Sequence, residues 1–124
     1  MNSNTDPAAI VQRQLDAYNA RDIEAFMATW SVDAEYFEHP AKLLARGAAQ
    51  IRERHVARFQ EPNLYGRLIN RIVVGNTVID HESVTRTFPE GTGQIDVIAI
   101  YEVENDRIAK AWFILGEHNL DAKP

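Results

Sequence analysis

The residues of this chain best suited to move protons are a histidine in front of a proline and a short acidic cluster. His39 precedes Pro40, and an imidazole, with an ordinary pKa of about 6.5, can take up a proton at neutral pH and return it. Asp80, His81 and Glu82 are consecutive. On a strand, alternation would place Asp80 and Glu82 on one face and His81 on the other, so the three cannot act as one triplet.

A second group of polar residues occupies positions where an ordinary domain has apolar core. Gln14 and Tyr18 fall on the apolar stripe of the first expected helix, and His55 falls on that of a later one. Burial of hydrogen-bonding groups is unfavourable unless they find partners, so their placement predicts a lined cavity. The Gln14 amide could orient a ligand carbonyl, and Tyr18 offers both ring surface and a hydroxyl.

Each candidate also has a purely structural interpretation. His39 could be a strand-end histidine bonded to a neighbour, and Gln14 could be satisfied by His55. Tyr18 could lie at a core edge with its hydroxyl in water. Asp80 could belong to a solvated acidic edge near a hairpin turn. The sequence leaves these alternatives open.

Several kinds of chemistry lack the residues they need. The chain has no cysteine, so disulfides, thiolate nucleophiles and sulfur-ligated metals are excluded. It contains no His-Glu-x-x-His helix, nucleophile elbow or glycine-rich phosphate loop, and its histidines fall on separate expected elements. We therefore expect neither a metal site nor a cofactor.

The net charge and the hydropathy of the chain limit the kinds of partner that it can bind. The net charge of -5 and pI of about 5.3 disfavour binding to nucleic acid. Arg52, Arg54 and Arg58 alternate with Glu53 and Glu61, which is typical of a solvated helix face rather than an anion site. No apolar run approaches the ~20 residues of a spanning helix, and the first residues lack the features of a secretory signal. We expect a cytoplasmic protein with no membrane partner.

The 124 residues predict a single domain, 1–124, in which three helices precede a meander of strands. Asp6 with Pro7 is a strong helix start, and Asp22 can cap a second helix that continues to Trp30. Gly75–Asn76 and Asn105–Asp106 suit tight hairpin turns. The remaining expected elements are a strand at 34–39, an extended piece at 42–46, a helix at 48–60, and strands at 67–74, 77–88, 94–104 and 107–115. The fold class is therefore α+β, with helices on one face of a long, twisted sheet.

Five short strings carry a resemblance over nearly the whole chain. They are Ala17 to Asp22, His39-Pro40, Gly47 with Ile51 to Glu53, Gly75-Asn76, and Gly116 to Leu120. In their order and spacing the chain resembles the nuclear transport factor 2-like superfamily, in particular its SnoaL-like and ketosteroid isomerase-like branch. The resemblance implies a cone-shaped fold with a strongly curved, mainly antiparallel sheet, an apolar pocket, and a homodimer formed through the outer sheet face. Members include isomerases, polyketide cyclases, dehydratases, epoxide hydrolases and proteins without catalysis, so it predicts a pocket but no single reaction.

Carried over from ketosteroid isomerase, the general base falls on His39 and the oxyanion-stabilising tyrosine on Gln14. A supporting tyrosine falls on His55, and the second oxyanion donor, a protonated aspartate, falls on Ala99. None of these positions keeps the family's residue. Loss of one oxyanion donor typically lowers the rate by about 100- to 1000-fold, so we do not expect efficient steroid isomerisation by that mechanism.

The same alignment turns Asp80 and Glu82 toward the cavity, where either could orient or reprotonate His39. A register shift of one residue would reverse this assignment. On the last strand, Trp112 and Ile114 would point outward, which supports the homodimer. The apolar wall of the pocket would consist of Phe37, Ala99, Tyr101, Ala111, Phe113 and Leu115.

Two functions remain. The first is a cofactor-independent isomerase or lyase acting on a small, largely apolar carbonyl or hydroxyl compound, with His39 as proton shuttle and Gln14, Tyr18 and His55 holding the polar end of the substrate. The second is a non-catalytic ligand-binding or scaffold protein, which the missing oxyanion donors at Gln14 and Ala99 favour.

Overall fold

The structure, a computed structural model, describes residues 6–121. Its three helices are α1 (Pro7–Ala20), α2 (Ile23–Met27) and α3 (Ala48–Arg58). The first two begin as expected: the Asp6 carboxylate accepts from the backbone N–H of Ala8 at 3.0 Å, and that of Asp22 accepts from Ala25 at 3.1 Å. These carboxylates satisfy backbone donors that the first helical turn leaves unpaired.

Six strands form one sheet in the order β2-β1-β6-β5-β4-β3. Only β1 and β6 run parallel, and every other neighbouring pair is antiparallel. Their bounds are β1 (Trp30–Glu38), β2 (Lys42–Arg46), β3 (Tyr65–Val74), β4 (Thr77–Phe88), β5 (Gly91–Glu104) and β6 (Arg107–Leu120).

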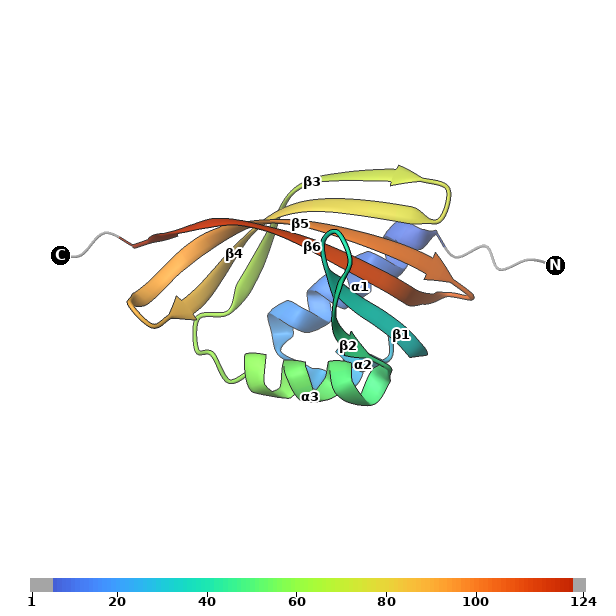
Figure 1. Ribbon diagram of the computed structural model, residues 1–124, viewed down its shortest axis with the longest axis horizontal. Helices are drawn as coiled ribbons and strands as arrows, with labels where there is room; N and C mark the ends of the chain where they lie inside the picture. The colour runs from blue at the N-terminus through green and yellow to red at the C-terminus, as the bar shows by residue number, and fades with distance from the viewer. Residues whose placement is uncertain (1–5, 122–124) are drawn as a thin grey trace.

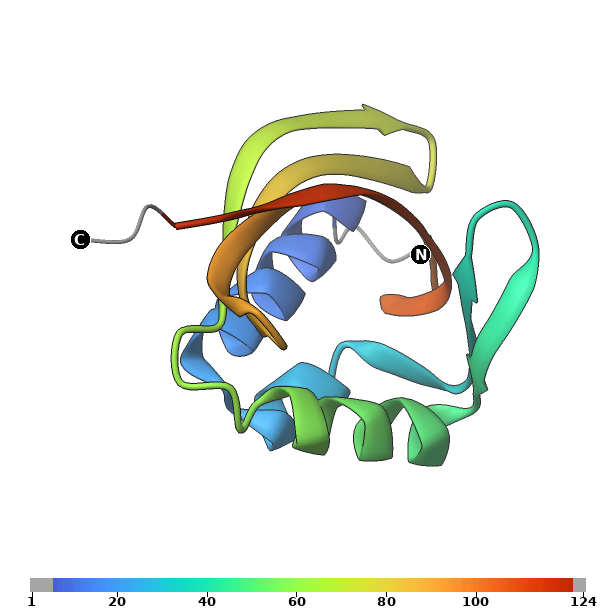
Figure 2. The ribbon, with the colours of Figure 1, turned by 60° about the vertical axis from the view of Figure 1, so that its left-hand side comes forward.

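The helices lie on one face of the sheet, and the long strands curl over α1 (Figures 1 and 2). Helix α1 packs against β3, β4, β5 and β6, whereas α3 packs against β1 and β2. The α+β fold predicted from the sequence, with a curved and mainly antiparallel sheet, is confirmed.

The hairpin turns form at the predicted residues. Gly75 has φ 59°, and Asn105 and Asp106 have φ 52° and 61°, a region that glycine, asparagine and aspartate tolerate best.

Several expected boundaries are wrong, and three of the differences are the largest. Trp30 begins β1 instead of ending the second helix, because it pairs with Ile108 at the start of β6. The loop expected up to Gly93 is shorter, since β5 begins at Gly91. Strand β6 continues beyond residue 115 to Leu120, where it pairs with Gly93.

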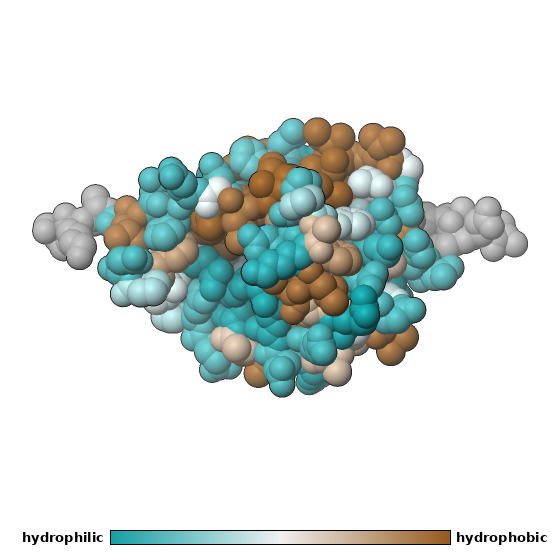
Figure 3. Space-filling view, viewed as in Figure 1, coloured by the Kyte–Doolittle hydropathy of each residue, from teal (hydrophilic) through white to brown (hydrophobic). Residues whose placement is uncertain are grey.

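The outer face of the sheet is unusually apolar. Trp112 stacks on Phe37, with ring centroids 5.6 Å apart, and the Ile114 side chain is 41% exposed. In Figure 3, apolar side chains gather at the top of the view, where β3 lies in Figure 1; on the outer face, β3 exposes Ile72 and Val74. Among the described residues, no helix is long and apolar enough to cross a membrane.

Candidate functional site

A cavity of about 110 Å³ lies between the helices and the concave face of the sheet. An engineered apolar cavity of about 150 Å³ is large enough to bind benzene, so this cavity suits a compound of roughly one ring or a short chain. Its lining combines apolar and aromatic residues with several ionisable ones: Gln14, Leu15, Tyr18, Trp30, Tyr36, Glu38, Leu44, Arg54, His55, Arg58, Glu82, Val84, Arg86, Ile95, Val97, Tyr101, Phe113 and Leu115.

Glu82 is the buried carboxyl of this cavity. Its residue is only 6% exposed, and burial, followed by the negative charge of Asp80, raises the pKa of the Glu82 carboxyl to about 7. The carboxyl fits because Gly66 of β3, which pairs with the neighbouring Val84, has no side chain: a Cβ there would lie 3.2 Å from Glu82 Oε1. A carboxyl with a pKa near neutrality can both take and give a proton under physiological conditions.

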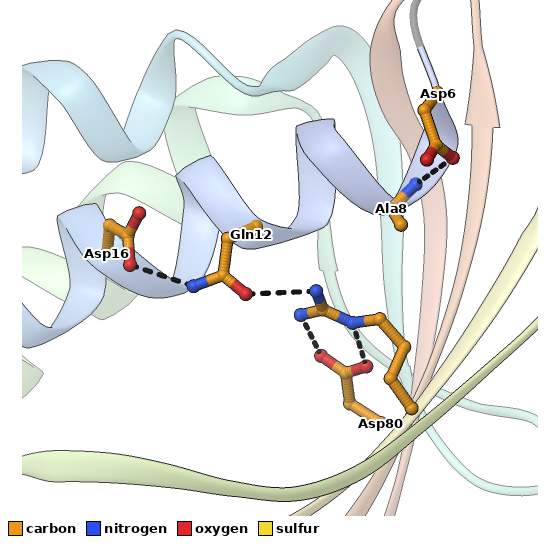
Figure 4. A network of polar contacts seen from close by, with 6 residues as sticks. Asp6, Ala8, Gln12, Asp16 and Asp80 are labelled. Atoms are coloured by element: carbon orange, nitrogen blue, oxygen red, sulfur yellow. Dashed lines mark hydrogen bonds and ion pairs between the residues drawn. The ribbon is translucent and has the colours of Figure 1, made fainter.

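Asp80 lies on the same face of β4 as Glu82 but has another task. It is fully buried, and the Arg71 guanidinium donates to both its oxygens at 2.7 and 2.9 Å. Gln12 of α1 accepts from the same guanidinium at 2.9 Å and donates to Asp16, so the pair ties the sheet to the helix (Figure 4). Asp80 is absent from the cavity lining. The interpretation of Asp80 as a solvated edge residue is wrong, and the structure gives it an ion pair instead of access to a ligand.

The face assigned to β4 from the resemblance agrees with the structure. Asp80, Glu82 and Val84 are buried, whereas His81 lies on the outer face, half-buried and 3.5 Å from Asp96.

His55 lies at the centre of an aromatic cluster next to the cavity. It is 2% exposed, and its Nδ1 lies 2.8 Å from the Ile51 carbonyl oxygen. A carbonyl can only accept, so Nδ1 carries the hydrogen and Nε2 is left as an acceptor. Burial, with the nearby arginines, lowers the pKa of His55 to about 4. The ring is therefore neutral at physiological pH and can accept a hydrogen bond from a ligand.

Gln14 and Tyr18 line the cavity from α1, each less than a tenth exposed. The Gln14 Oε1 atom is buried and has no hydrogen-bond partner among the described residues. The alternative in which His55 satisfies Gln14 is therefore not observed. Burial raises the pKa of Tyr18, and the nearby positive charge of Arg58 partly opposes that rise. We expect the unpaired Gln14 Oε1 to accept a hydrogen bond from a ligand, because buried polar atoms without partners are rare.

The placement expected for His39 and Phe37 is wrong, and by the same one-residue error. His39 is exposed, Phe37 stacks on Trp112 at the outer face, and neither lines the cavity. Their neighbours Tyr36 and Glu38 face the cavity instead. The register of β1 with β6 fixes these faces: Tyr36 pairs with Ala111 and Glu38 with Phe113 on the inner face, whereas Phe37 pairs with Trp112 on the outer face.

The remaining wall residues divide in two. Tyr101, Phe113 and Leu115 line the cavity, whereas Ala99 and Ala111 are buried in the core and absent from the lining. Ala99 pairs with Asp80 and Phe113 in the sheet, and its methyl group offers no hydrogen bond.

Three arginines of the lining were not among the expected site residues. Arg54 and Arg58 lie on either side of His55 on α3, and Arg86 comes from β4. The solvated interpretation holds for Arg52, which pairs with Glu24, but is wrong for Arg54 and Arg58. One signal was present in the sequence: two like charges four residues apart on a helix are mutually unfavourable, so they need a reason to be there.

No group of three or more His, Asp or Glu side chains within residues 6–121 is arranged to hold a metal ion.

Comparison with known proteins agrees with this architecture. The family model described as SnoaL-like domain matches residues 11–111. An uncharacterised cystatin-fold protein from Novosphingobium aromaticivorans is similar in structure, with a TM-score of 0.82 and 24% identity over 90% of this chain and 99% of that one. No curated protein sequence matches the chain.

Two further solved structures share the fold. One is an NTF2-like protein of unknown function from Cytophaga hutchinsonii, with a TM-score of 0.75 and 13% identity over 93% of this chain and 94% of that one. The other is a hypothetical protein with a ketosteroid isomerase-like fold from Catenulispora acidiphila in complex with trimethylamine, with a TM-score of 0.75 and 13% identity over 86% and 85%. At these identities the likeness concerns the fold.

Proposed function

The chain belongs to the SnoaL-like domain family, and from this premise we propose that it is a small-molecule enzyme of the isomerase or lyase type in which Glu82 transfers the proton. The observation that carries the proposal is a buried carboxyl with a pKa of about 7 in the wall of a largely apolar cavity. Perturbed carboxyls in such cavities are typical of acid–base catalysts.

The proposed step begins with ionised Glu82. Its carboxylate removes a proton from a carbon next to a carbonyl group, the C–H electron pair forms a carbon–carbon double bond, and negative charge collects on the carbonyl oxygen. In a β,γ-unsaturated substrate, protonated Glu82 then returns the proton to the γ carbon, so that the double bond moves into conjugation; in a β-hydroxy carbonyl compound, it gives the proton to the hydroxyl as the C–O bond breaks, which releases water and leaves an α,β double bond.

Two further residues of the lining suit this step. The Gln14 amide hydrogens can donate to the developing oxyanion, although a neutral amide stabilises it less than an acidic donor does. The unprotonated Nε2 of His55 can accept a hydrogen bond from a substrate hydroxyl. His39 has no part in the proposal because it is exposed.

Proton exchange into simple ketones tests the proposal, because the exchange requires only the first step of the reaction. Cyclohexanone, acetophenone and 3-hydroxycyclohexanone are incubated with the protein in D₂O, and NMR follows deuterium entering next to the carbonyl. We expect the wild type to accelerate exchange of at least one ketone. The Glu82→Gln variant should lose at least about 100-fold of that acceleration, whereas Glu104→Gln, at an exposed site, should retain it. Equal exchange by wild type and Glu82→Gln would remove Glu82 from the mechanism.

The second candidate function is ligand binding without catalysis. Ala99, which cannot donate to an oxyanion, and the neutral amide of Gln14 favour it. Native mass spectrometry of the purified protein, followed by incubation of any co-purifying compound, separates the two functions. A retained compound that is never transformed, together with no acceleration of exchange for any of the ketones, would favour this second function.

A further inference from the structure

The positive and negative charges around the cavity do not balance. Five ionisable residues besides His55 and the tyrosines line it, three arginines and two glutamates. Arg86 is already matched, because it donates to both oxygens of Glu61 at 2.9 and 2.7 Å. Glu82 is partly protonated at neutral pH. Glu38 is therefore the one carboxylate left to balance Arg54 and Arg58 among the described lining residues.

Neither Arg54 nor Arg58 forms an ion pair with a carboxylate of residues 6–121. The Arg54 guanidinium lies over the Tyr36 ring, 5.3 Å from the centroid, and its Nε is buried without a hydrogen-bond partner. Arg58 interacts electrostatically with the Tyr18 hydroxyl. The Arg54 guanidinium is thus held against the Tyr36 ring, and both arginines have donor groups without a carboxylate partner among residues 6–121. An arginine fork that is already positioned suits a planar carboxylate.

The pKa of His55 is independent evidence that this positive charge lies close to the cavity. Arg58 and Arg54 both contribute to the lowered pKa of His55, which lies between them on α3 and within the lining. An anion seated at these arginines would therefore stand beside the neutral imidazole and close to the aromatic walls.

We propose that the cavity binds a small organic acid, with its carboxylate at Arg54 and Arg58 and its apolar body among the aromatic and aliphatic lining residues. This inference deepens the proposed function, on which it rests for the cavity being the ligand site, and it names the substrate class. The apolar body is about the size of one ring or a short chain, as the volume of about 110 Å³ requires. A hydroxyl or amine hydrogen on that body would find the unpaired oxygen of Gln14.

The test compares acids with neutral molecules of the same shape. Binding of benzoate, phenylacetate and hexanoate to the full chain is measured by calorimetry against benzamide, phenylacetamide and hexanamide, with benzylamine as the cationic probe. We expect at least one acid to bind about tenfold more tightly than its amide, because a hydrogen bond to a charged partner is worth about that factor. The preference should weaken as salt concentration rises.

Variants on the same helix identify the residue. Arg54→Gln should remove about tenfold of the acid's affinity and leave the amide unchanged, whereas Arg52→Gln, at the arginine paired with Glu24, should change neither. Absence of any acid preference over its amide, an unchanged preference in Arg54→Gln, or tighter binding of benzylamine than of benzoate would each overturn the proposal.

The same measurement on Glu82→Gln separates this inference from the proposed function. That variant should keep its preference for the acid, since the arginines remain. A protein that binds acids but exchanges no protons would refute the proposed catalysis and leave the ligand class standing.

Discussion

The buried carboxyl of Glu82 affects the stability of the fold as well as the chemistry of the site. Glu82 has an ordinary pKa of 4.5 and one of about 7 in the folded chain. Between these values the folded state holds a proton that the unfolded state has released. Raising the pH through this window therefore favours unfolding, because ionisation of a desolvated group is resisted in the folded state.

This sign gives a direct prediction for Glu82→Gln. The amide cannot ionise, so the variant should gain up to about 3 kcal/mol of unfolding free energy relative to the wild type as the pH rises from 4.5 to 8. Urea unfolding of both proteins across this range measures the difference. Glu104→Gln serves as the control and should follow the wild-type profile, and parallel profiles for wild type and Glu82→Gln would show that Glu82 ionises normally.

Single residues also show what the sequence could not decide. Both Asp80 and Glu82 are buried on one face of β4, yet only Glu82 reaches the cavity, because Arg71 from β3 holds Asp80. That division depends on a partner nine residues away in the chain. Strand alternation predicted the shared face, and only the neighbouring strand decides which carboxylate is free.

Among the elements, β1 is the one whose orientation the sequence conceals. Its residues Tyr36, Phe37, Glu38 and His39 put an aromatic and a polar side chain on each face, so hydrophobic alternation gives no preferred orientation. On β4, by contrast, the resemblance supplied the orientation that the structure shows. The same ambiguity affected α3, where interleaved charges suggested solvent although Arg54 and Arg58 lie in the cavity wall.

We predict that the pairing of the long strands β5 and β6 depends on a close approach of their backbones at Gly93. A Cβ at Gly93 would overlap the carbonyl oxygen of Asn119 and lie 2.9 Å from Leu120 Cα, whereas one at Gly116 would meet Asp96 Cβ at 3.3 Å. Gly93→Ala should therefore destabilise the fold by roughly 1–3 kcal/mol and more than Gly116→Ala does. It should also reduce hydrogen-exchange protection in residues 116–120. Equal stability of the two variants would show that the end of β6 adjusts freely.

At the scale of the molecule, the outer sheet face predicts a homodimer. Ile72, Ile79, Ile98 and Ile100 lie on the same face as Trp112 and Ile114, as the strand register requires. Monomers rarely leave large contiguous apolar patches in water. A second copy of the chain would cover this face symmetrically.

Ile114→Glu tests this association. It places a charge in the expected interface and should shift the protein from dimer to monomer in analytical ultracentrifugation, with at least a tenfold rise in the dissociation constant. Val56→Glu is the matched control, because Val56 is 44% exposed on α3, away from that face, and Ile114 is 41% exposed. A wild type that remains monomeric at high concentration would contradict the prediction.

The parallel pairing of β1 with β6 has a consequence for folding during synthesis. Tyr36 pairs with Ala111 and Trp30 with Ile108, so one edge of β1 stays unpaired until β6 is available. On the ribosome, this pairing can close only after β6, residues Arg107–Leu120, has emerged. Until then the aromatic side chains of β1 lack the strand beside which they pack, so we expect the interval between synthesis of β1 and of β6 to be when the chain most needs protection by chaperones.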